Sequence, residues 1–149
     1  MSSIGGMRGI CLFLVVFSCF RFLDHSKEEF VPKKDYPVGA VEYIKNNLDY
    51  KNLKIYNGYD YGSYLLFQDI PVFIDARCDL YLKEFNGMSY SIFDKMEKIS
   101  KNYEKEFQKL GVSHILISKK EILFLILDKD IHYKTLYEDK NFILFEKVI

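Results

Sequence analysis

Short apolar runs alternate with polar stretches along the chain, and their spacing predicts alternating helices and strands. Val38, Val41, Ile44 and Leu48 recur at helical spacing, and Pro37 suits the first position of that helix. Strands are expected where β-branched and aromatic residues run together between turn residues. After residue 35, the predicted elements are a helix over 36–48, a strand over 53–57, a helix over 61–68, a strand over 71–75, helical sequence over 89–110 that ends at Gly111, a strand over 112–118, a helix over 119–127 and a hairpin over 132–148.

This order of elements predicts an α/β domain. Its strands are apolar throughout, which is typical of a parallel sheet that helices cover on both faces. The last run turns at the polar residues 138–141, so its two halves would add antiparallel edge strands. We therefore expect a small three-layer domain with a short parallel sheet and a C-terminal β-hairpin, preceded by one hydrophobic N-terminal helix.

The apolar run at residues 10–20 is unbroken apart from Ser18 and is flanked by Arg8 and Arg21. Residues 4–23 are just long enough to cross a bilayer if both arginines reach the headgroups. We expect this segment to be a transmembrane anchor, with the lipid bilayer as its partner.

Other interpretations of this segment stay open. Its uncharged centre has the length of a signal-peptide core, and Val16 and Ser18 suit a cleavage site. The sequence VFSC, which ends at Cys19, is similar to a lipoprotein box, and a buried core helix is the remaining alternative. In the membrane interpretations, Arg8 and the acidic residues of 24–30 favour a domain outside the cytoplasm.

The chain is thus expected to have three parts. Residues 4–23 form the anchor or a signal segment, and residues 24–35 form a polar linker that contains Pro32. Residues 36–149 form the α/β domain, which we expect on the extracytoplasmic side of the cell membrane.

Charge and composition narrow the class of ligand. Residues 1–23 hold two arginines and no acid, which leaves 19 basic residues against 21 acidic ones in the rest of the chain. A domain so close to neutral lacks the clustered cations that bind nucleic acid. Aromatic residues make up 17 % of the chain, and exposed tyrosines would suit a polar ligand such as a sugar or a peptide.

The cysteines and histidines indicate neither a disulfide nor a metal site. Cys11 and Cys19 belong to the apolar run, so Cys78 stands alone in the domain. The histidines, His25, His114 and His132, are widely separated, and no cysteine spacing fits zinc. We expect no metal and no cofactor.

Polar residues and glycines gather where the predicted strands 53–57 and 71–75 end. In open parallel sheets, ligands bind outside the carboxyl ends of the strands. Gly58 and Gly62 would let the backbone turn closely there, and the following helix would point its amide dipole at this rim. The candidate binding residues are Asn57, Tyr59, Asp60, Tyr61, Asp75, Arg77 and Asp79.

The same rim also suits a structural role. Asp60 would cap the helix, and Arg77, the only arginine of the domain, would pair with Asp75 or Asp79 to hold the loops. We expect the charged residues to be mainly structural. Tyr59 and Tyr61 are the better candidates to face a ligand, because tyrosine combines a large apolar area with a polar tip.

Motifs of the common catalytic sites are missing. There is no P-loop, no complete G-x-G-x-x-G and no G-x-S-x-G elbow. Asp75 and Asp79 would resemble the carboxylate pair of a glycosidase, but Arg77 between them would lower both pKa values rather than raise one. No catalytic residue is assigned.

The rim resembles a known family. Its pattern is Asn57, Tyr59, Tyr61-Gly62, Tyr64-Leu65, Val72-Phe73-Ile74-Asp75, Arg77, Asp79 and Tyr81. Over residues 36–147 the chain is similar to the extracytoplasmic C-terminal domain of polytopic bacterial membrane proteins. Those proteins resemble GT-C-type glycosyltransferases, which use lipid-phosphate-linked sugars. More distantly, residues 60–62 resemble part of the Trp-Trp-Asp-Tyr-Gly motif of the oligosaccharyltransferase catalytic subunit, although this chain has no tryptophan.

The resemblance implies that the chain is the C-terminal part of a larger membrane protein, with residues 4–23 as its last membrane helix. The catalytic acid of such enzymes lies in an early loop between membrane helices and has no counterpart here. The domain would then be accessory or acceptor-recognising, and its partners would be the missing multi-helix portion and a saccharide or peptide acceptor. The alternative is a self-standing, membrane-anchored or lipidated binding module with no enzymatic role.

Overall fold

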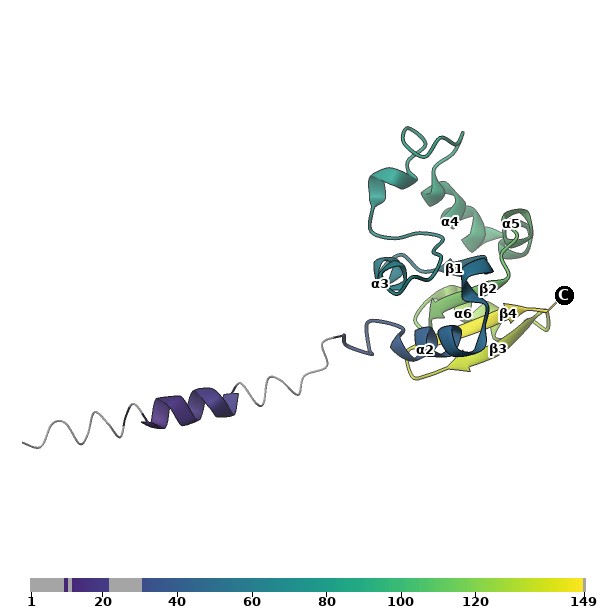
Figure 1. Cartoon of the computed structure of the whole chain (residues 1–149). Helices are drawn as coiled ribbons and strands as arrows, with labels where there is room; N and C mark the ends of the chain where they lie inside the picture. The colour runs from purple at the N-terminus through teal and green to yellow at the C-terminus, as the bar shows by residue number, and fades with distance from the viewer. Residues whose placement is uncertain (1–9, 11, 22–30, 149) are drawn as a thin grey trace, which may run out of the picture. The chain divides into compact units, whose positions relative to one another are not determined.

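A computed structural model describes residues 10, 12–21 and 31–148 of the chain (Figure 1). The chain divides into two compact units, Met1–Pro32 and Lys33–Ile149. In the first unit, residues 10 and 12–21 are helical. No helix among the described residues is both long and apolar enough to span a bilayer. Much of the expected anchor 4–23 and most of the linker 24–35 lie outside the described residues, and both stay predictions.

The second unit holds a four-stranded sheet and its covering helices. In chain order its elements are α2 (Val38–Asn47), η1 (Tyr50–Asn52), β1 (Ile55–Asn57), α3 (Gly62–Phe67), η2 (Cys78–Tyr81), α4 (Ile92–Lys101), α5 (Tyr103–Leu110), β2 (His114–Ser118), α6 (Ile122–Leu127), β3 (Tyr133–Glu138) and β4 (Phe142–Lys147), where η marks a 3-10 helix.

The strands lie in the order β1-β2-β4-β3. β1 runs parallel to β2, with Asn57 opposite Leu116. β4 is antiparallel to both β2 and β3. The predicted α/β class and the C-terminal hairpin are therefore confirmed, and the sheet is mixed.

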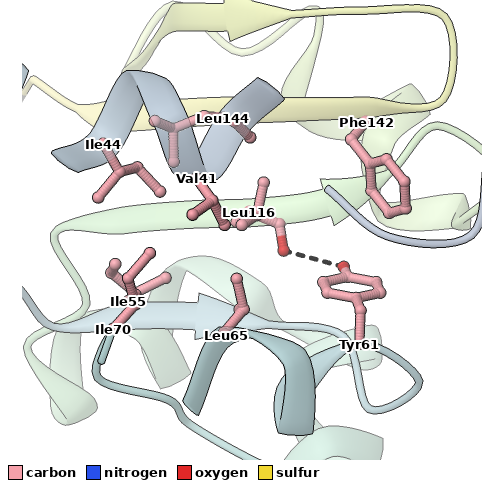
Figure 2. Packing of buried hydrophobic residues seen from close by; sticks show 10 residues of the cluster. Val41, Ile44, Ile55, Tyr61, Leu65, Ile70, Leu116, Phe142 and Leu144 are labelled. Carbon is pink, nitrogen blue, oxygen red and sulfur yellow. Dashed lines mark hydrogen bonds between the residues drawn. The ribbon is translucent and has the colours of Figure 1, made fainter. Parts of the chain in front are cut away.

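Helices cover the sheet on both faces, which gives the expected three layers. On one face, α2 and α3 pack against β1, β2 and β4 through a core that includes Val41, Ile44 and Leu65 (Figure 2). On the other face, α4, α5 and α6 bury Ile99, Phe107 and Leu127 against the same strands. Residues of β2 alternate between the two cores, because successive side chains of a strand point to opposite faces.

The predicted strand over residues 71–75 is wrong, because this segment belongs to no β-ladder. Its backbone is bound instead by the side chain of Asn57, which is fully buried at the end of β1. The Asn57 amide nitrogen donates to the Ile74 carbonyl at 2.8 Å, and its Oδ1 accepts from the Phe73 N–H at 2.7 Å. One side chain thus satisfies backbone groups that a neighbouring strand would otherwise have paired.

The helical stretch predicted over 89–110 is divided at Asn102 into two helices that lie side by side (Figure 1). Ser91 and Asp94 form a capping box at the start of α4. Asn102 ends α4 and caps α5 by accepting a hydrogen bond from the Lys105 N–H. Gly111 ends α5 in the left-handed region, with φ of 66°, as its place after the apolar pattern predicted.

Candidate functional site

A pocket of about 370 Å³ lies at the carboxyl ends of the parallel strands β1 and β2. This is where open parallel sheets commonly bind ligands. The residues just after β1 and those around the end of β2 supply most of its polar lining. The side chains that matter for its chemistry are those of Lys34, Tyr59, Asp60, Tyr61, Lys120 and Glu121.

Tyr61 forms part of the pocket wall, yet its ring belongs to the core. The residue is only 4 % exposed, and its ring meets the Phe142 ring edge-on, with 5.2 Å between centroids. Its hydroxyl accepts a hydrogen bond from the Gly58 N–H at 3.0 Å. The same hydroxyl lies 3.0 Å from the Leu116 carbonyl oxygen, toward which it points in Figure 2. The expectation that Tyr61 presents its ring to a ligand is therefore corrected.

Glu121 is the functional candidate that the sequence interpretation missed. Its Oε1 accepts from the Ser118 N–H and from the Tyr61 hydroxyl, both at 3.1 Å. Burial raises the pKa of Glu121 above its ordinary value, and the nearby charge of Asp60 adds to this rise. The signal was present, because Ser118 is followed three residues later by Glu121 just before an apolar run, which is the spacing of a capping box.

Tyr59 and Asp60 line the outer part of the same pocket. Tyr59 is partly exposed, and its hydroxyl lies 2.7 Å from the sulfur of Cys78. Asp60 is exposed and does not cap α3 as expected, because Tyr61 occupies the N-cap position and makes no side-chain capping bond. The Asp60 carboxylate therefore makes no capping hydrogen bond to α3.

Of the two aspartates predicted as partners of Arg77, Asp75 forms the ion pair. The guanidinium Nη2 lies 2.6 Å from Asp75 Oδ2, and Nε donates to Oδ1 at 2.9 Å. The Asp75 side chain is 0 % exposed, whereas that of Arg77 is 54 % exposed. Hydrogen bonds from Arg77 lower the pKa of Asp75 to about 2. Neither residue lines the pocket, so this pair holds a loop rather than a ligand.

The pocket lining thus includes three of the seven predicted site residues and leaves out the other four. Tyr59, Asp60 and Tyr61 meet at the pocket. Asn57 lies beneath the rim as a buried bridge between β1 and residues 73–74. Of the others, Asp75 and Arg77 pair with each other outside the pocket lining, and Asp79 is exposed in η2.

The pocket carries cations and carboxyl groups together. Lys34 and Lys120 provide the positive groups. Asp60 provides an exposed carboxyl group, and Glu121 provides a partly buried one. Mixed charge of this kind favours a neutral, hydroxyl- or amide-bearing ligand over a polyanion. Within the described part of the chain, no group of three or more His, Cys, Asp and Glu side chains is placed to hold a metal ion.

Comparison of the chain with protein-family models, with curated proteins and with solved structures finds no match.

Proposed function

We propose that the domain is an accessory, acceptor-binding domain of a membrane protein of the GT-C glycosyltransferase type, placed on the extracytoplasmic side of the cell membrane. The observation that carries this proposal is the pocket at the ends of β1 and β2, which gathers Tyr59, Asp60, Lys120 and Glu121. Its ligand would be a saccharide or a peptide, and the domain alone would catalyse no reaction.

The side chains of the pocket suit such a ligand. Tyr59 offers a partly exposed ring for an apolar sugar face or a peptide side chain. Asp60 would accept hydrogen bonds from hydroxyl or amide groups, and Lys34 and Lys120 would donate them. Glu121 Oε1 is already bound by the fold, so its Oε2 is the oxygen left for a ligand.

Binding can be tested by titrating the full chain, in detergent micelles, with N-acetylglucosamine, mannose and a short neutral peptide, followed by calorimetry. Tyr59→Ala and Lys120→Ala should weaken the binding of whichever probe binds the unaltered chain. Lys129→Ala is the matched control, because Lys129 is also exposed and stands after the end of α6, away from the pocket lining. Equal affinity in Lys120→Ala and Lys129→Ala, or no binding of any probe, would contradict the proposal.

A further inference from the structure

Helix α6 is apolar on every side, and none of the residues that the structure describes covers one of its faces. All six of its residues, Ile122–Leu127, are large and apolar. Leu127 is buried at 1 % exposure, whereas Ile122, Leu125 and Ile126 are 78 %, 62 % and 39 % exposed. A helix that is apolar all round is normally covered all round. The uncovered face therefore indicates contact with an apolar surface beyond the described residues.

The start of α6 lies beside the point where the chain enters the domain. The Asn141 side-chain amide donates to the Lys33 carbonyl at 3.4 Å. The next residue, Lys34, lines the same pocket as Lys120 and Glu121, which directly precede α6. The segment that leads in from the apolar N-terminal run thus joins the domain near this helix.

The length of the connecting chain limits how far α6 can be from a membrane. Residues 12–21 are helical and mostly apolar, and only residues 22–32 separate them from the domain. Those residues can span at most about 40 Å when fully extended. A bilayer that takes up the apolar run is therefore within reach of the exposed face of α6.

We propose that Ile122, Leu125 and Ile126 form a second membrane contact, lying in the interfacial region of the bilayer that anchors the N-terminal run. The proposal rests on the membrane placement in the proposed function. Lys120 and Lys129 are exposed just before and just after the helix, where their ammonium groups would reach anionic headgroups.

A second exposed apolar pair provides a matched control. Leu66 and Phe67 of α3 are 42 % and 84 % exposed. The buried residue Leu65 of α3 belongs to one core and Leu127 of α6 to the other, so the two helices cover opposite faces of the sheet. A flat membrane that contacts α6 should not contact Phe67.

The chain has no tryptophan, so a single introduced tryptophan reports its own surroundings. We would reconstitute the full chain, carrying Leu125→Trp, Phe67→Trp or Val15→Trp, in vesicles of phosphatidylcholine and phosphatidylglycerol. The vesicles would be prepared with and without acyl chains brominated near the headgroup. Leu125→Trp should show blue-shifted emission that brominated lipid quenches, whereas Phe67→Trp should show neither.

The outcomes separate this proposal from the anchor on which it rests. Quenching of Val15→Trp without quenching of Leu125→Trp would keep the anchor and overturn the second contact. Equal quenching of Leu125→Trp and Phe67→Trp would also overturn it. A blue shift of Leu125→Trp that brominated lipid does not quench would place α6 against a second copy of the chain instead. Absence of quenching in Val15→Trp would overturn the anchor itself.

Discussion

Replacement of Tyr61 should lower the stability of the domain more than replacement of Arg77. The sequence suggests the opposite order, because it favours a structural role for Arg77 and a ligand-facing role for Tyr61. Tyr61→Ala should destabilise the domain strongly, because it removes a 4 % exposed ring from the core and a hydroxyl that binds the Gly58 N–H. Arg77→Leu should destabilise it less. The buried Asp75 carboxylate loses its charged partner, but the guanidinium is half exposed and Asp75 keeps its hydrogen bond from the backbone N–H of residue 77.

The magnitudes follow from what each change removes. Loss of a buried aromatic ring typically costs about 3–5 kcal/mol, and a buried group left without its hydrogen bond adds about 1–3 kcal/mol. Tyr61→Phe keeps the ring and should cost only the second part, about 1–3 kcal/mol. Since small domains are stable by about 5–15 kcal/mol, Tyr61→Ala should leave the domain close to unfolding at room temperature.

Urea unfolding of the full chain in detergent micelles, followed by circular dichroism, measures these differences. The slope of each transition must stay constant for the free energies of unfolding to be compared. Arg77→Leu should in addition flatten the acid dependence of stability. The Asp75 pKa falls from 3.8 to about 2 on folding, so its contribution is complete above pH 4 and is lost as the pH falls through 2. A larger loss of stability in Arg77→Leu than in Tyr61→Ala would refute the reasoning.

Four further predictions concern other parts of the molecule. Asn57→Ala should lower the free energy of unfolding by about 2–5 kcal/mol in the same urea assay, because the backbone groups of residues 73 and 74 lose their hydrogen bonds to the amide; an unchanged midpoint would contradict this. Gly62→Ala should reduce the yield of folded protein seen by circular dichroism, since its Cβ would collide with the Ile74 carbonyl oxygen; Gly87→Ala, which would meet no atom within 4 Å although its φ is positive, is the milder comparison. Burial lowers the pKa of His114 below 6.5, so the unfolded chain takes up the proton first and stability should fall as the pH drops below 6.5; His114→Gln should weaken that dependence in pH-dependent melting, and an unchanged profile would refute it. A reporter active only in the cytoplasm should be silent when fused after Ile149, and activity there would contradict the extracytoplasmic placement.

The sequence predicted α2 well because the burial of this helix follows a local period: Val41 and Ile44 recur at helical spacing and are buried. Strand β2 shows no such period, since four of its five residues are buried between the two cores. The strand prediction for residues 71–75 failed because an apolar run indicates only that a segment is buried, not that it pairs in a sheet. Its hydrogen-bond partner is the side chain of Asn57, and nothing in the run itself indicates this.

The site was predictable where its contacts are local in the chain. Asp75 and Arg77 are two residues apart, and their pairing could be inferred from spacing and charge. Tyr61 and Glu121 are 60 residues apart and meet only because β1 and β2 are parallel neighbours. Glu121 could be noticed from its spacing to Ser118, although its side chain makes no capping bond to α6. Its place in the pocket depended on the sheet order.

Gly58 shows why the inner wall of the pocket is fixed while its rim can vary. A Cβ at this position would lie 2.6 Å from the Tyr61 hydroxyl and 2.8 Å from Glu121 Oε1, so the loop after β1 can approach both groups only with glycine there. The Tyr61 hydroxyl joins these residues, because it accepts a hydrogen bond from the Gly58 N–H and lies 3.1 Å from Glu121 Oε1 and 3.0 Å from the Leu116 carbonyl oxygen of β2. A ligand would therefore meet a wall whose geometry the core determines. Exposed side chains such as Asp60 would then determine ligand specificity, because they can be substituted without disturbing that core.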